Sequence, residues 1–243
     1  TQMDFVMENS LFIPQDLAVF ISKPAADKML ILGPVAFSGK FNGTNTVFRT
    51  SGKLNTGLGY REGDVSMRIK DSMSLSAYEG QVALKKFKLG KLLVLEDYLG
   101  TIDLSAKIKV NGFSNQSANV DFDGLISEIN FNRYAYKRVS LKGNLQKQLF
   151  KGTVAVKDSH LLANMSGEIN LRQAKPSYQL EGRVDRADMA QLHFTKEPIR
   201  IKSDFDIDFA LNTWDDLTGR GFFQDVYIQK PQMEDLAMDM VTF

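Results

Sequence analysis

Hydrophobic and polar residues alternate with a period of two along most of this 243-residue chain. Between Leu104 and Val110 the apolar residues alternate with serine and lysine, and between Asp204 and Phe209 they alternate with aspartate. Successive side chains of a β-strand point to opposite faces of a sheet, so each run predicts one apolar and one polar face. The same alternation occurs in the runs 65–70, 153–157, 163–171 and 178–184. The chain is therefore predicted to be mostly β.

Residues typical of turns separate these runs. They lie at 42–43, 57–59, 62–64, 111–112, 142–144, 175–177 and 219–221. Their spacing is typical of a meander of antiparallel strands. We expect on the order of a dozen strands or more, with a mean length of about five or six residues.

Four segments break the alternation and are predicted to form short helices, at 16–21, 89–99, 188–192 and 233–241. In the second of them, Leu92, Leu95 and Leu99 recur at helical spacing, and Gly100 follows as a stop. These helices would be minor additions to the sheet.

A loose repeat is visible in the pattern. Similar short sequence motifs occur around Asn42, Asn111 and Asn212, and a further glycine follows each of them downstream. Such a degenerate repeat indicates β units that bury one another along an extended architecture. We divide the chain into a first repeat region, 1–110, and a second, 111–243, which continues the first across a polar stretch at 111–119.

The amino-acid composition limits the kinds of partner and of site that we expect. The 30 basic and 29 acidic residues leave a net charge of +1, so we expect no basic surface for nucleic acid. The absence of cysteine excludes disulfides and thiolate ligands. The longest apolar run, from Met29 to Phe37, is much shorter than the roughly 20 residues of a transmembrane helix. We expect the chain to be an internal piece of a longer protein, with any membrane anchor outside it.

The sequence contains no recognisable catalytic or metal-binding motif. The only two histidines, His160 and His193, are interpreted as structural residues of a strand and a loop. Asp204, Asp206 and Asp208 alternate with apolar residues, so they predict the polar face of a strand rather than a calcium loop. We expect no catalytic residue, no metal and no other cofactor.

A weak calcium-loop candidate and one class of enzyme remain to be considered. The segment 119–124 is closer to a calcium loop, but Asn130 stands where the bidentate acidic residue is required. Carboxylate pairs that hydrolyse sugars assemble in space rather than in sequence, so one enzyme class stays open, a right-handed β-helix glycosidase.

Alternation alone fits two architectures. The apolar faces can close on each other in a sandwich or barrel, which is the reading that alternation favours. They can also line one long sheet whose apolar side stays partly open, and such a trough would need an apolar occupant. Lipid acyl chains are the natural occupant.

The order of the motifs favours the second architecture. It resembles the repeats of the TamB family of translocation and assembly module proteins, within the AsmA-like group, and is most similar to the versions in Bacteroidetes. The resemblance spans roughly residues 10 to 230, and it is carried by glycine and hydrophobic positions in the segments 87–93, 99–100, 110–112, 141–145, 150–154, 156–161, 165–171, 176–180 and 186–192. The membrane helix that usually begins this family, and its C-terminal region, are not recognisable here.

The resemblance implies a β-taco, a long twisted antiparallel sheet folded lengthwise around an apolar groove, in a periplasmic protein anchored in the inner membrane. It implies transport of phospholipid or another lipid between the two membranes. Alternatives are assembly of outer-membrane proteins with a TamA-type barrel and, more weakly, a β-helix polysaccharide hydrolase. We expect a non-enzyme whose groove is lined by Ile108, Val110, Ile129, Phe131, Val154, Val156, Ile169, Leu180, Phe205, Ile207 and Phe209.

Overall fold

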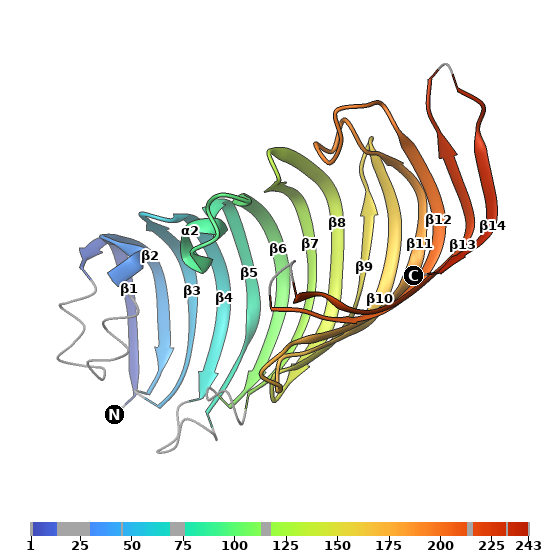
Figure 1. Ribbon diagram of the computed structural model, residues 1–243. Coiled ribbons are helices and arrows are strands. Elements are labelled where there is room, and N and C mark those ends of the chain that lie inside the picture. Colours follow the sequence, from blue (N-terminus) through green and yellow to red (C-terminus); the bar gives the residue numbers. More distant parts are fainter. Residues whose placement is uncertain are drawn as a thin grey trace.

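The computed structural model describes residues 2–13, 30–44, 46–68, 76–112, 118–212, 216–231 and 233–242. Fourteen antiparallel strands form one sheet in which the strand order follows the chain order, as predicted for a mostly β meander (Figure 1). The strands are β1 Met3–Phe12, β2 Val35–Gly43, β3 Val47–Thr56, β4 Gly59–Arg68, β5 Ala77–Lys88, β6 Leu99–Asn111, β7 Asn119–Phe131, β8 Tyr134–Gln146, β9 Leu149–Lys157, β10 Leu161–Asn170, β11 Ser177–Asp188, β12 Arg200–Ala210, β13 Thr218–Gln229 and β14 Leu236–Thr242. The described helices are a 3-10 turn, η2 (Leu30–Leu32), and a short helix, α2 (Leu89–Leu93).

The sheet is open and forms a single layer. Among the described elements, each strand packs chiefly against its neighbours in sequence, and α2 packs against β6. The chain exposes 15760 Å², whereas a compact monomer of 27.3 kDa would expose about 11,000 Å². The sandwich that alternation alone favoured is therefore wrong, because no second sheet covers the first in the part of the chain that the structure describes.

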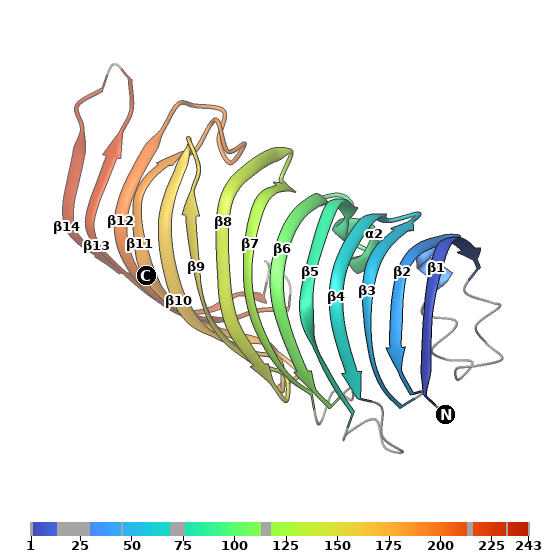
Figure 2. The ribbon, with the colours of Figure 1, turned by 180° about the vertical axis from the view of Figure 1, so that it is seen from behind.

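A row of irregularities crosses the sheet from β5 to β13. The strand register shifts next to Lys86 and Asp103, and again at Asp185 and Asp225. Lys86, Arg138 and Asp225 have positive φ angles of 47°, 54° and 50°, as expected where an extra residue is inserted into a strand. Because such bulges bend a strand and increase its twist, the strands are bowed along this line (Figures 1 and 2). We call this line the bulge row.

The pairing register gives the sheet one apolar and one polar face. Directly opposed residues of an antiparallel pair place their side chains on the same face, so one face can be followed from strand to strand. One such row runs through Val110, Val120, Leu145, Phe150, Ile169, Tyr178 and Phe209. The alternate positions, which are mostly charged or polar, form the polar face.

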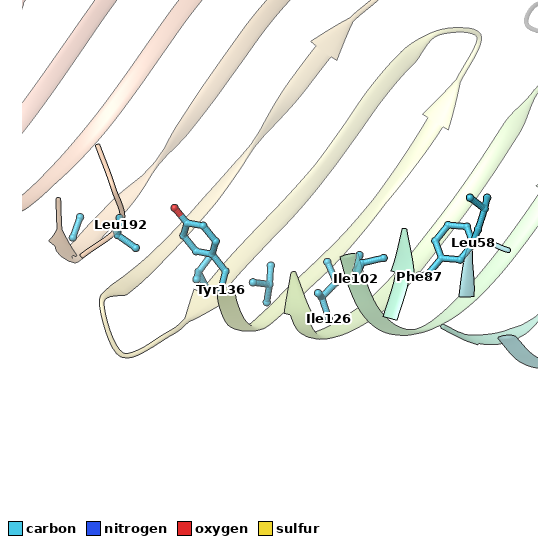
Figure 3. Packing of buried hydrophobic residues seen from close by; sticks show 9 residues of the cluster. Leu58, Phe87, Ile102, Ile126, Tyr136 and Leu192 are labelled. Atoms are coloured by element: carbon cyan, nitrogen blue, oxygen red, sulfur yellow. The ribbon is translucent and has the colours of Figure 1, made fainter. Parts of the chain in front are cut away.

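The buried core lies on the apolar face at the bulge row (Figure 3). Its members are Leu58, Phe87, Ile102, Ile126, Tyr136, Val139, Val156, Ala187 and Leu192. Several of them directly precede or follow a bulged position, as Phe87 follows Lys86 and Val139 follows Arg138. The bend therefore concentrates burial along one line of an otherwise uncovered sheet.

Three predicted turns are wrong. The segments 62–64, 142–144 and 219–221 lie within β4, β8 and β13. Their glycines fall in phase with the apolar positions, as Gly143 does between Leu141 and Leu145, so they belong to the apolar face. The turn at 57–59 is confirmed, because Gly57 and Leu58 connect β3 to β4.

Of the predicted helices, 89–99 is confirmed in its first part as α2, which ends at Val94 in a left-handed conformation. The prediction for 233–241 is wrong, because β14 occupies Leu236–Thr242. The prediction for 188–192 is also wrong, because β11 ends at Asp188 and turns follow. The segment 16–21 lies outside the described residues. Across 111–119, β6 and β7 pair directly, so the sheet continues from one repeat region into the other.

Candidate apolar binding face

All the predicted groove-lining residues lie on the apolar face. They are Ile108 and Val110 in β6, Ile129 and Phe131 in β7, Val154 and Val156 in β9, Ile169 in β10, Leu180 in β11, and Phe205, Ile207 and Phe209 in β12. Val156 is 6% exposed and belongs to the core, whereas Phe131 is 41% exposed. The others are half-buried, so most of them are covered only by neighbours in the same sheet.

Aromatic rings lie over glycines on this face, and three of these places share one sequence motif. The shared motif is Phe-x-Gly, at 37–39, 122–124 and 150–152. A methyl group added at Gly124 would come within 2.6 Å of the Phe122 ring, and one at Gly152 within 2.6 Å of the Phe150 ring. The phenyl ring therefore lies along the strand over the glycine two residues on, as when aromatic residues cover glycines in designed sheets. This keeps the apolar surface smooth and close to the backbone.

Stacked rings continue the apolar face to the first strand. Phe5, Phe41 and Phe48 stack in sequence across β1, β2 and β3, with 4.8 Å between successive ring centroids. Tyr178 and Phe209 stack in the same way at 4.9 Å. Phe5 is 40% exposed, so the surface remains accessible at this end of the sheet.

The polar face carries a different chemistry. Asp204 lies 3.4 Å from Arg183, Asp208 lies 3.6 Å from Arg220, and Asp123 lies 3.8 Å from Lys142. The predicted acidic strand face at 204–208 is thus confirmed. The segment 119–124 lies in β7 rather than in a loop. Within the described residues no three His, Asp or Glu side chains are grouped to hold a metal ion.

One hollow of the described residues lies mainly on the polar face. It has a volume of about 800 Å³, and its lining includes Ser166, Arg183, Asp204 and Asp206. Arg183 lies 3.4 Å from Asp204, and the Ser166 hydroxyl donates a hydrogen bond to the exposed Glu181 carboxylate at 3.1 Å. The hollow is also wide and shallow, and its lining contains no histidine. We therefore base the functional interpretation on the apolar face, whose residues are exposed without being enclosed.

A polar network fastens the strand ends beyond the bulge row. Asp158 is 4% exposed and accepts hydrogen bonds from the Tyr134 hydroxyl and from the backbone N–H groups of Lys137 and His160. Burial alone would raise the pKa of the Asp158 carboxyl, but these donors hold it below its usual value. Burial, reinforced by nearby Tyr134 and Asp158, raises the pKa of the neighbouring Tyr136 to about 12.

Both histidines lie in loops of this region, His160 between β9 and β10 and His193 after β11, so neither occupies the strand position that was predicted for one of them. His160 Nδ1 lies 3.1 Å from Asp188, whose other carboxylate oxygen accepts from Arg200 at 2.7 Å. The His193 carbonyl accepts from the Asn132 side chain at 3.2 Å. The first contact joins the β9–β10 connection to the end of β11, and the second ties the segment after β11 to the β7–β8 turn. Leu192 within that segment is only 1% exposed. Both histidines thus take part in contacts that join loops of the fold.

No family model, curated protein or solved structure matches this chain. Among the described residues, no helix has the length and apolar character needed to cross a membrane. The functional interpretation therefore rests on the geometry of the apolar face.

Proposed function

We propose that the apolar face binds the acyl chains of lipids, and that the protein is a segment of a periplasmic bridge that carries phospholipid or another lipid between membranes. One observation carries the proposal. Apolar side chains continue across all the strands of the described sheet, and no second layer built from the described residues covers them. A monomeric soluble protein rarely exposes so extensive an apolar surface without something to cover it.

The mechanism in this proposal is passive and catalyses no reaction. Each Å² of apolar surface removed from water contributes about 25 cal/mol, and this attraction has no preferred direction. The binding free energy of an acyl chain is therefore similar at each strand, and the chain can move from one strand to the next. The rings that lie over Gly124 and Gly152 favour such movement, because they leave few projections in the path.

The cellular setting of the proposal follows the TamB resemblance. In it the protein is anchored in the inner membrane through a part outside this chain and works with a TamA-type barrel in the outer membrane. Both free edges of the described sheet, at β1 and β14, are suited to continuing the sheet. The polar face and its ion pairs would then face the periplasm.

A second candidate is an assembly factor for outer-membrane proteins. The observation that favours it is the pair of edge strands, which present unpaired backbone groups on their outer sides. A client strand could pair with such an edge. Crosslinks from β1 or β14 to barrel strands, without lipid crosslinks on the apolar face, would favour this function over transport.

The β-helix hydrolase has no comparable support. A β-helix is built from parallel coils, whereas every strand pair of the described sheet is antiparallel. We do not propose it further.

Photocrosslinking tests the lipid proposal directly. A photoreactive side chain at Ile207 or Val154 should crosslink to lipid in cells, because both positions face the apolar surface. The matched controls are the adjacent positions Asp206 and Thr153, which lie on the polar face and should give no lipid adduct. Equal yields of lipid adduct on both faces, or no adduct on either face, would contradict the proposal.

A charge placed on the apolar face should block transport without unfolding the sheet. Ile207→Arg and Val154→Arg place a guanidinium where acyl chains would pass, while Asp206→Arg and Thr153→Arg place it on the polar side. We expect loss of lipid transfer between donor and acceptor vesicles for the first two variants only. Normal transfer by Ile207→Arg and Val154→Arg would contradict the mechanism.

A further inference from the structure

The apolar face carries a single charged side chain in the described strands, that of Arg61. Followed from partner to partner, the positions of this face are otherwise hydrophobic residues, glycine, serine or threonine. Arg61 lies in β4, directly opposite Leu54 of β3 and Leu84 of β5. Its neighbours across the sheet are thus leucines on both sides.

The guanidinium of Arg61 stacks on an aromatic ring and interacts electrostatically with the Tyr78 side chain of β5. Its central carbon lies 4.5 Å from the centroid of the Phe87 ring. The buried Nε makes no hydrogen bond, and no ion pair with a carboxylate occurs among the described residues. Burial lowers the pKa of this guanidinium, which still stays charged because arginine ionises far above neutral pH.

Arginines on the polar face are placed differently. Arg49, on the adjacent strand β3, pairs with Asp64 through two of its nitrogens. Arg183 and Arg220 pair with Asp204 and Asp208. These three arginines of the polar face thus have carboxylate partners, whereas the single arginine of the apolar face has none among the described residues.

A structural role explains only part of this arrangement. The stack on Phe87 is a cation–π contact, which contributes to stability when it is partly buried. It satisfies none of the five N–H donors of the guanidinium. A half-buried charge without an ionic partner is costly, and a methionine or leucine would cover Phe87 without that cost.

We infer that Arg61 binds the anionic phosphate of a lipid headgroup whose acyl chains lie on the apolar face. This inference rests on the proposed function and names the lipid class, which is a phosphate-bearing lipid rather than a neutral one. The planar guanidinium matches a phosphate through two parallel hydrogen bonds. Phe87 holds the plane of the guanidinium in place, and the apolar side chains around Leu54 and Leu84 receive the chains.

The experiment compares two lipids with identical acyl chains. The purified protein is incubated with dioleoyl phosphatidic acid or with dioleoylglycerol, and bound lipid is measured by native mass spectrometry. The wild-type protein should retain the phosphatidic acid roughly tenfold better, as expected for one charge-assisted hydrogen-bonded pair. Arg61→Met should remove this preference and leave binding of dioleoylglycerol unchanged.

Two further variants separate binding from folding. Arg49→Met, the matched control on the polar face of the next strand, should keep the preference. Arg61→Lys should keep part of it, because lysine retains the charge but not the paired geometry. Arg61→Met should unfold at the same urea concentration as the wild type or a higher one, whereas a purely structural arginine would give a lower midpoint.

The outcomes distinguish the two levels of the proposal. If the wild type binds both lipids equally, or if Arg61→Met keeps the preference, the role of Arg61 is wrong while acyl-chain binding stands. If the wild type binds neither lipid, the proposed function itself fails.

Discussion

The bulge row and the rest of the apolar face are built from the same kinds of residue, yet they differ in burial. At the bulge row the bent strands, the β3–β4 turn and the segment after β11 bring side chains together, and Leu58 and Leu192 are 0% and 1% exposed. Beyond it, Ile169, Leu180 and Ile207 stay half-buried. The same alternating pattern thus yields a core where the sheet bends and an accessible surface where it does not. Close packing is thereby concentrated in one part of this face, and the proposed acyl-chain surface lies mainly in the other.

The largest expected effect tests this division directly. Leu192→Ala removes a side chain from the core and should lower the free energy of unfolding by about 2–5 kcal/mol. Leu180→Ala removes the same atoms from the accessible surface and should cost less than about 1.5 kcal/mol, because little cavity forms. Urea unfolding followed by circular dichroism measures both. Equal costs would show that the two regions are packed alike.

A second prediction concerns the polar network beside the bulge row. The folded-state pKa of Asp158 is depressed, so its stabilising effect is present above the usual aspartate pKa of about 3.9 and is lost as the pH falls through the folded value. Asp158→Asn should therefore cost about 1–3 kcal/mol at pH 7. The gap between variant and wild type should narrow as the pH falls below about 4.

The measurement is thermal unfolding at neutral and acid pH, with Asp206→Asn as the control. Asp206 is exposed on the polar face and should change the free energy of unfolding by less than about 0.5 kcal/mol at either pH. A gap for Asp158→Asn that stayed constant with pH would show that the carboxylate is not what stabilises this region.

The smallest effect probes the rings that cover glycines on the accessible surface. Gly124→Ala forces the Phe122 ring away from the backbone, so it should destabilise the protein, by about 1 kcal/mol. In a Phe122→Ala background the same change should be neutral or slightly stabilising, because alanine suits a strand better than glycine. A double-mutant cycle should therefore give a coupling of about 0.5–1.5 kcal/mol. Additive changes in the free energy of unfolding would mean that the packing of the Phe122 ring does not depend on Gly124.

Period two in the sequence was sufficient to predict the strands, their antiparallel order and the shared face of the candidate lining residues. The prediction from this alternation failed at glycines, because glycine occurs both in turns and on the apolar face of strands. Gly143 was interpreted as a turn residue, although it keeps the phase of Leu141 and Leu145. That phase was the available signal, and it would also have placed Arg61 on the apolar face.

The bulge row explains a second wrong prediction, that of a helix at 233–241. In β14, Leu236, Met238 and Val241 are opposite Ile228, Val226 and Phe223, which are residues of the apolar face on either side of the bulge at Asp225. The interruption of period two produced a spacing that suits a helix, so a strand was predicted as one. Bulges at Lys86 and Arg138 have no glycine to mark them, and their alignment depends on neighbouring strands. No local reading of the sequence can supply that information.

The match between strand order and chain order has a consequence for how the protein forms. Consecutive strands pair with one another along the whole described sheet, so most new pairings close only a short loop and cost little chain entropy. The sheet can then grow hairpin by hairpin as the chain emerges during synthesis, with each finished strand serving as the template for the next. A failure at one hairpin would stop growth there and leave the strands already formed intact, as in other architectures where units contact only their neighbours.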